Sequence, residues 1–342
     1  MITQSPVPQL VFVQLGSAPC RWLAPNVKAH VASFGGSVFV VSDQVGTLRD
    51  APRWGAEPVG FTPTAETRAL LAHMCDRAGF RRGFWSYTAV RFAAIEQLQA
   101  QAKDLAIVHV ESDVVLNPNL DLSAFGRVGS GIQIARLGFG KVAGAVMFSK
   151  SAKDIGRLRE FVFDYLEANP GSNEMAGLDE FRRCRGDLVG VLPTAPSPTS
   201  PVFRGELDPS TRADLSRLTS EFNGVFDVAG VGQYLFGTDP QNAGGWRWVR
   251  RSFDDHYVDP RRIDFGLDSS GWPCVIDDGV ACSFLSMHIH SKDLRAFTRD
   301  SFNPLLVERL GSASLAPARE LDPWALGERL MGKVNRMRGL RG

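Results

Sequence analysis

The first half of the chain alternates short apolar runs with longer segments of mixed polarity. Residues 10–16 and 37–43 are two such runs, and residues 26–34 between them have the length of a crossover helix. Short and nearly continuous apolar runs are typical of strands that are buried on both faces of a sheet. Strand, helix and strand in this order predict a parallel sheet with right-handed crossovers.

The most strand-like segment spans residues 105–116, and it contains two acids, Glu111 and Asp113, near its end. In an extended chain, side chains two residues apart point to the same side. Ligands of open α/β sheets lie beyond the carboxyl ends of the strands. Two carboxylates that point together repel unless a positive group lies between them, and a hard divalent cation is such a group. The segment therefore predicts a metal site; the alternative is two solvated acids that close a strand.

The same reasoning predicts the other elements of an α/β fold. Glycine and alanine in the run 142–148 indicate a strand that another group approaches closely. Residues 194–201, rich in proline and serine, are typical of a linker, a mobile lid or a surface loop. The glycine-rich residues 222–239 lack the Walker pattern and a preceding strand, and predict a substrate wall or a short helix against the sheet. We expect a short strand at 57–61 and helices at 64–77, 88–103, 153–168 and 175–183.

A second chemically distinctive stretch lies near the C-terminus. In extended chain, His288, His290 and Lys292 share one face. Imidazole binds divalent transition ions such as Mn²⁺, and an ammonium group pairs with phosphate. One of these histidines together with Asp113 would give a mixed oxygen and nitrogen site. Arg91, near the start of a predicted helix, opposes the helix dipole, so it serves a ligand anion or an acid, unless it is a surface arginine.

Composition narrows the functional classes. The 342 residues include 38 basic and 37 acidic side chains, so the net charge of +1 gives no indication of a nucleic-acid partner. No signal peptide or transmembrane run is seen, and the dispersed cysteines favour free thiols, so we expect a cytoplasmic protein. From Asp322 onward, a basic amphipathic helix is predicted, which packs on the protein or lies on an anionic membrane surface. The cysteines are Cys20, Cys75, Cys184, Cys274 and Cys282.

Several of these segments together resemble bacterial glycosyltransferases of the GT-A fold. The resemblance runs from about residue 11 to residue 292, and its most specific part is the order of the acidic motif and the histidine-lysine motif. It is carried by Ser42-Asp43, by Trp85-Ser86-Tyr87 before Arg91, by residues 109–114, by residues 226–239 and by residues 288–292.

The resemblance implies an α/β fold with a mostly parallel Rossmann-type sheet flanked by helices. Residues 1–292 would form one catalytic domain, with a nucleotide-binding half up to about residue 117 and an acceptor half at 118–292. Residues 293–342 would form a helical extension. The implied activity is transfer of a sugar from a nucleotide-diphosphate donor to a glycan or lipid-linked glycan, in cell-surface or secreted polysaccharide synthesis.

The resemblance also assigns site residues. Asp113 and a histidine, preferably His290 rather than His288, would bind Mn²⁺ or Mg²⁺. Glu111 stands where the family has its first aspartate, which leaves its role between metal and ribose open. For the donor, Asp43 would face the base, an alternative being a simple turn acid, and Lys292 would touch the diphosphate.

An inverting enzyme also needs a base for the acceptor hydroxyl. The candidates are Asp227 and Asp179, in that order, and the sequence does not decide between inversion and retention. Two other functions remain open: a sugar-phosphate nucleotidyltransferase and a non-catalytic nucleotide- or glycan-binding protein on the same fold.

Overall fold

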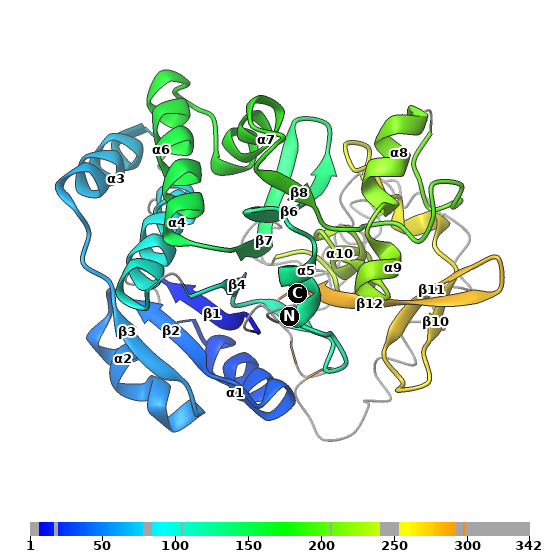
Figure 1. The fold of residues 1–342 in the computed structure, drawn as a ribbon, viewed down its shortest axis with the longest axis horizontal. Coiled ribbons are helices and arrows are strands. Elements are labelled where there is room, and N and C mark those ends of the chain that lie inside the picture. Colours follow the sequence, from blue (N-terminus) through cyan, green and yellow to red (C-terminus); the bar gives the residue numbers. More distant parts are fainter. Residues whose placement is uncertain are drawn as a thin grey trace, which may run out of the picture.

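A computed structural model describes residues 7–16, 20–77, 84–103, 105–205, 207–239, 253–291, 294 and 297. The described chain contains a large sheet with helices on both faces and a smaller sheet beside it (Figure 1). Lys292 and almost all of the predicted extension at 293–342 lie outside the described residues, so the boundary at residue 292 stays a prediction. None of the described helices combines the length and the apolar character needed to span a membrane.

The large sheet confirms the predicted α/β class. Its strand order is β3-β2-β1-β4-β7-β6-β8. The first four strands of this order are parallel, β7 runs antiparallel to both β4 and β6, and β8 is parallel to β6. The sheet is therefore mixed but mostly parallel. The strands are β1 (Gln9–Gln14), β2 (Val38–Ser42), β3 (Glu57–Gly60), β4 (Ile107–Val110), β6 (Ile132–Gly138), β7 (Lys141–Ser149) and β8 (Val189–Val191).

Two helical layers bury the two faces of this sheet. One apolar core joins the sheet to α1 (Leu23–Phe34), to η1 (Ala51–Trp54) beside α2 (Val45–Asp50), and to α5 (Ser123–Arg127). The other joins it to α3 (Ala65–Arg77), α4 (Phe84–Gln101), α6 (Ala152–Ala168) and α7 (Glu174–Cys184) (Figure 1). Each predicted helix of the first 184 residues is present, with bounds that differ by a few residues.

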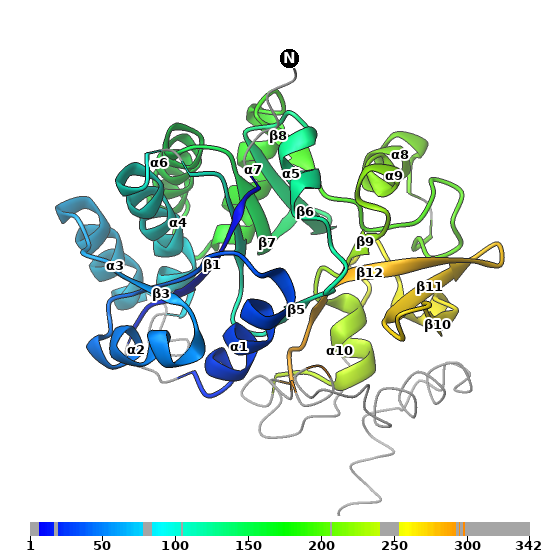
Figure 2. The same cartoon turned by 60° about the horizontal axis from the view of Figure 1, so that its bottom comes forward.

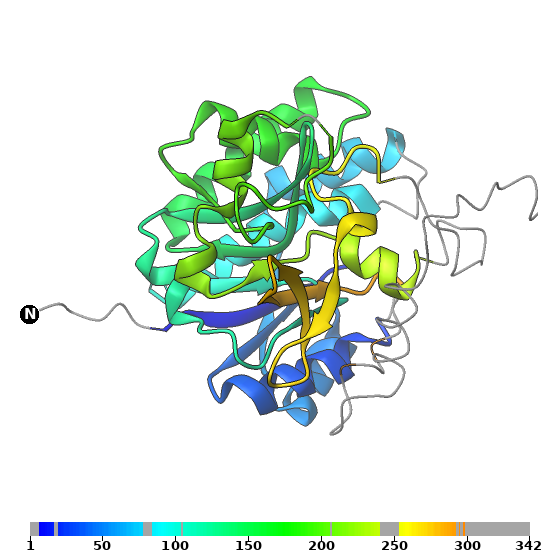
Figure 3. The ribbon, with the colours of Figure 1, turned by 90° about the vertical axis from the view of Figure 1, so that its right-hand side faces the viewer.

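The smaller sheet is built mainly from the last third of the described chain. Its order is β10-β11-β12-β5, and β9 pairs in parallel with β12. A third apolar core lies between this sheet and α10, which packs beside β12 (Figures 2 and 3). The elements are β5 (Val114–Leu116), α8 (Pro209–Ser216), α9 (Thr219–Phe222), β9 (Val225–Phe226), α10 (Gly230–Phe236), η3 (Pro260–Arg262), β10 (Phe265–Leu267), β11 (Pro273–Asp277) and β12 (Val280–His288).

The segment 105–116 forms two strands in two different sheets, not the single strand that was predicted. β4 lies in the large sheet and β5 pairs with β12 in the smaller one. Glu111, Ser112 and Asp113 form the turn between them, closed by a 3.0 Å hydrogen bond from the amide of Val114 to the carbonyl of Glu111. The two acids therefore lie on a turn at the junction of the sheets.

Two further segments resolve alternatives left open by the sequence. Residues 194–201 form a loop fixed to the smaller sheet, because the hydroxyls of Ser197 and Ser200 donate to Asp277 and Ala195 is fully buried. Residues 222–239 contain the short helix α10 against β12, as one of the sequence alternatives predicted, and they also contain the strand β9.

Candidate metal centre

Helix α1 fixes the turn that carries the two acids. The side-chain amide of Asn26 donates to the carbonyls of Ser112 and Val114, at 3.0 and 2.7 Å. The indole nitrogen of Trp22 donates to the hydroxyl of Ser112 at 3.0 Å. Asn26 is fully buried, so these bonds are shielded from competing water. The residues around Asp113 are therefore held from both sides along the backbone.

Strand β12 brings a histidine to the same turn. His288 lies opposite Val114 in the antiparallel pairing, and the amide of Ile289 donates to the carbonyl of Asp113. The Nε2 atom of His288 is 3.3 Å from Oδ2 of Asp113 and 3.6 Å from Oε2 of Glu111. One ligand atom from each of the three residues lies within 4.8 Å of the other two. We call Glu111, Asp113 and His288 the acid–histidine cluster.

The cluster has the donor chemistry of a divalent metal site. Two carboxylates and an imidazole offer oxygen and nitrogen ligands, and two acids this close repel without a cation. Asp113 and His288 are buried, and Glu111 is partly buried. Burial acts to raise the pKa of Glu111, but the positive charges of Arg91 and His288 outweigh it, and the net pKa is lowered. Glu111 is thus kept in the ionised form that a metal requires.

Arg91 lies behind the cluster, and it faces an acid, as one of the sequence alternatives predicted. Its Nη1 contacts Oε1 of Glu111, and its Nη2 is 3.5 Å from Oε1 of Glu174. Burial raises the pKa of Glu174 to about 7, and the charge of Arg91 acts against this rise. Glu174 was missed by sequence reasoning, because an acid in the first turn of a helix is also typical of simple capping.

Asp227 reaches the cluster through the backbone of His288. Its Oδ2 accepts hydrogen bonds from the amides of His288 and Gly232, at 3.0 and 2.8 Å, and its Oδ1 accepts from the amide of Val231 at 3.0 Å. Burial raises the pKa of Asp227. This carboxylate joins the start of α10 to the end of β12, and its predicted role as a general base stays a prediction.

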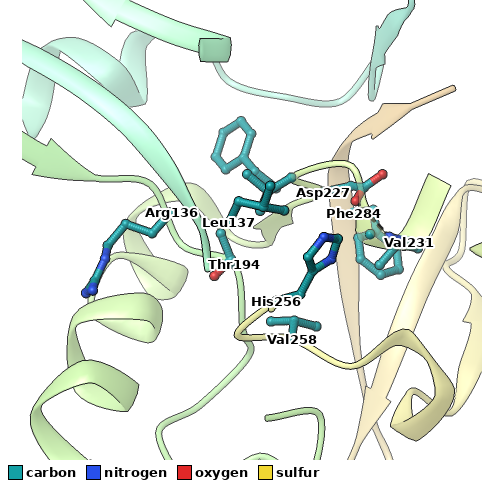
Figure 4. A pocket seen from close by; sticks show the side chains of 11 residues that line it. Arg136, Leu137, Thr194, Asp227, Val231, His256, Val258 and Phe284 are labelled. Atoms are coloured by element: carbon teal, nitrogen blue, oxygen red, sulfur yellow. Dashed lines mark hydrogen bonds between the residues drawn. The ribbon is translucent and has the colours of Figure 1, made fainter. Parts of the chain in front are cut away.

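Asp227 also borders a small cavity on the side of β9. The cavity has a volume of about 20 Å³, room for one or two water molecules at most. Figure 4 shows the ring of His256 at its centre, with Thr194, Asp227 and Val231 around it. This cavity is too small for a sugar, so we place no substrate there.

Three other predicted site residues lie within the described chain, and each has contacts of its own. The ring of His290 stacks on His288 with centroids 4.1 Å apart, but the structure groups His288, not His290, with the two acids. Asp43, after β2, accepts from the amide of Gly16 at 3.1 Å and from the side chain of Gln44. Asp179 pairs with Arg182 of the same helix at 3.1 Å. The roles predicted for His290, Asp43 and Asp179 stay predictions.

Comparisons with known proteins return similar structures but no similar sequences. No family model matches the chain, and no curated protein matches it. Mouse xyloside xylosyltransferase 1 in its apo form has a TM-score of 0.39 and 11% identity, over 54% of this chain and 85% of that one.

Two further structures are similar to a comparable extent. The apo form of the glycosyltransferase GlyE of Streptococcus pneumoniae TIGR4 has a TM-score of 0.37 and 13% identity, over 54% of this chain and 44% of that one. The PaToxG glycosyltransferase has a TM-score of 0.36 and 10% identity, over 52% of this chain and 68% of that one. The match thus spans less than half of GlyE, and at these TM-scores the function has to be argued from the site itself.

Proposed function

We propose that this protein is a metal-dependent glycosyltransferase that moves a sugar from a nucleotide-diphosphate donor to a glycan or lipid-linked glycan. The observation that carries the proposal is the acid–histidine cluster, whose ligand atoms lie within 4.8 Å of one another. The cluster follows the carboxyl end of β4, where open α/β sheets bind their ligands. A donor would reach a metal held there from the side of Glu111, the one member of the cluster that is only partly buried.

The residues of the cluster would hold Mn²⁺ or Mg²⁺ through carboxylate oxygens of Glu111 and Asp113 and the Nε2 atom of His288. When bound, such an ion stabilises the negative charge that develops on the departing nucleoside diphosphate. We choose His288 over His290 because its imidazole is the one beside both carboxylates.

The donor would extend from the cluster toward the carboxyl ends of the parallel strands β1 and β2. Asp43 follows β2 and would accept a hydrogen bond from the base or ribose. Lys292 would pair with the diphosphate, four residues after His288. Asp227, and after it Asp179, are the proposed bases for an inverting reaction. A cytoplasmic location and a role in cell-surface or secreted polysaccharide synthesis complete the proposal.

The test is a metal titration followed by a donor screen on the purified full chain. Wild type should bind Mn²⁺, measured by calorimetry and by the loss of free-ion electron paramagnetic resonance signal. Wild type should also release nucleoside diphosphate from one member of a panel of nucleotide sugars. Asp113→Asn should abolish both, because it removes one of the two charges that attract the ion.

The matched control is Asp121→Asn, because Asp121 is an exposed acid eight residues further along that pairs with Arg127. It should bind Mn²⁺ as wild type does. Unchanged Mn²⁺ binding and turnover in Asp113→Asn would contradict the proposal. Release of pyrophosphate from a nucleoside triphosphate and a sugar phosphate would instead indicate a nucleotidyltransferase, and nucleoside diphosphate binding without transfer would indicate a binding protein.

A further inference from the structure

We propose that Glu174, a residue that touches none of the three members of the acid–histidine cluster, positions that cluster by holding Arg91. The inference rests on the proposed function, because it assumes that the cluster binds a metal. Its starting point is a buried charge arrangement that crosses three elements. Glu174 begins α7, Arg91 lies in α4, and Glu111 follows β4.

Two members of this arrangement are almost fully removed from water. Arg91 is 5% exposed and Glu174 is 3% exposed. A buried guanidinium without a partner is strongly destabilising, so Arg91 depends on its two carboxyl partners for its position. The guanidinium divides its two terminal nitrogens between two carboxylates, with Nη1 on Glu111 and Nη2 toward Glu174.

Gly144 in β7 provides the space for the guanidinium. A Cβ atom at residue 144 would lie 2.6 Å from Nη2 and 3.2 Å from Cζ of Arg91. Neither atom is free to withdraw, because the group is buried and held at both ends. The close approach that the small residues of 142–148 predicted is therefore the approach of Arg91. The absence of a side chain at Gly144 lets the guanidinium lie where it contacts both Glu174 and Glu111.

The division of Arg91 between two acids determines which oxygen of Glu111 faces the metal. Arginine prefers to bind one carboxylate with two parallel hydrogen bonds. If Arg91 did so with Glu111, both oxygens of Glu111 would turn toward the guanidinium. Nη2 instead lies 3.5 Å from Oε1 of Glu174, and Arg91 donates to Oε1 of Glu111 through Nη1. Oε2 of Glu111 stays 3.6 Å from the Nε2 atom of His288. Glu174 thus keeps one oxygen of Glu111 available to the cluster.

The decisive variant is Glu174→Gln, which keeps the shape of the side chain and one acceptor oxygen but removes its charge. Binding is measured at about pH 8, where the wild-type carboxyl, with its pKa of about 7, is ionised. The affinity for Mn²⁺ alone should fall about tenfold, as is usual when a group that orients a metal ligand is changed. The Mn²⁺ resonance spectrum of the bound ion should change as well, because Glu111 is reoriented. The matched control is Glu180→Gln, since Glu180 lies on the same helix and pairs with Arg183. It should bind Mn²⁺ within twofold of wild type.

A double variant separates a positioning role of Glu174 from a general effect on folding. If Glu174 acts through Arg91, then Glu174→Gln should have no further effect on Mn²⁺ affinity in a protein that already carries Arg91→Met. An equal loss in both backgrounds would overturn the inference, as would unchanged Mn²⁺ affinity in Glu174→Gln alone. In both cases, normal Mn²⁺ binding by wild type leaves the proposed function standing. Absence of Mn²⁺ binding by wild type would overturn the proposed function and this inference together.

Discussion

The backbone amide of Ile289 donates a 2.8 Å hydrogen bond to the carbonyl oxygen of Asp113. This bond continues the antiparallel pairing of β5 and β12, in which His288 lies opposite Val114. The acid and the histidine of the cluster are thus brought together by sheet register, not by their side chains. Changes that disturb the backbone around this bond should therefore impair the cluster while leaving all three ligands in the sequence.

Asn26→Ala tests the attachment of the acidic turn to α1. The substitution leaves the carbonyls of Ser112 and Val114 without their donor, and each buried carbonyl without a partner costs about 1–3 kcal/mol. We expect the free energy of unfolding to fall by about 2–4 kcal/mol in urea denaturation, and Mn²⁺ affinity to fall with it. Asn169→Ala is the control, because the exposed side chain of Asn169 bonds only to the end of its own helix. An equal loss in both variants would show that the hydrogen bonds from Asn26 to the acidic turn have no special role.

Gly232→Ala tests the contact between α10 and the end of β12. A Cβ atom at residue 232 would lie 1.9 Å from the carbonyl oxygen of His288 and 2.9 Å from Oδ2 of Asp227. The strand end has to move, so we expect both thermal stability and Mn²⁺ affinity to fall. Gly46→Ala, in α2, has open space around it and should be neutral or slightly stabilising. Normal Mn²⁺ binding by Gly232→Ala would mean that the position of His288 is not set by this contact.

His30 gives the fold a pH dependence that can be measured. Its Nε2 accepts from the amide of Leu116 at 3.2 Å while its Nδ1 bonds to the carbonyl of Asn26, so a second ring proton would face a donor. Burial lowers the pKa of His30 from 6.5 to about 4, with the bond to Asn26 acting in the opposite direction. The folded state therefore holds the neutral ring. The stability that depends on a neutral His30 is fully present above pH 6.5.

As the pH falls from 6.5 to about 4, the unfolded chain takes up a proton that the folded chain does not. The stability contributed by His30 is lost in this window, and it amounts to about 3 kcal/mol for a shift of this size. Urea denaturation of wild type and of His30→Gln at several pH values measures it. The difference between the two curves should shrink with falling pH, because only wild type loses the stability that depends on His30. His109, whose pKa burial lowers to about 3, is present in both proteins, so its own titration cancels in the difference. A constant difference would contradict the prediction.

Local sequence patterns predicted β1, β2, β3, β4 and β7 of the large sheet, because burial on both faces of a strand leaves a continuous apolar run, but they missed β6 and β8. They did not predict that residues 105–116 would divide between two sheets. The break at Glu111–Asp113 depends on β12, which pairs with β5 from far along the chain. An apolar run by itself contains no information about its later partner, so the extended backbone expected at the two acids was wrong, and they lie on a turn.

The second histidine shows the same limit. Extended geometry places His288 and His290 on one face, but the chain turns after His288, where the amide of His290 bonds to the carbonyl of His288 at 3.1 Å. His288 consequently faces the acids and His290 stacks on it. Glu174 escaped prediction for a different reason: nothing in a helical pattern reveals that its first acid is buried beside an arginine from another helix.

Asp227→Asn distinguishes a structural carboxylate from a catalytic base. The two oxygens of Asp227 accept three backbone hydrogen bonds, and asparagine offers one acceptor oxygen and a donor that would face those amides. We expect a loss of about 2–4 kcal/mol in the free energy of unfolding, together with weaker Mn²⁺ binding. Asp208→Asn is the control, because Asp208 caps α8 at the surface and asparagine caps helices almost equally well. Unchanged stability and Mn²⁺ affinity with lost turnover would instead identify Asp227 as the base, and a pH profile of turnover would then show its pKa raised above the ordinary value for aspartate, as burial dictates.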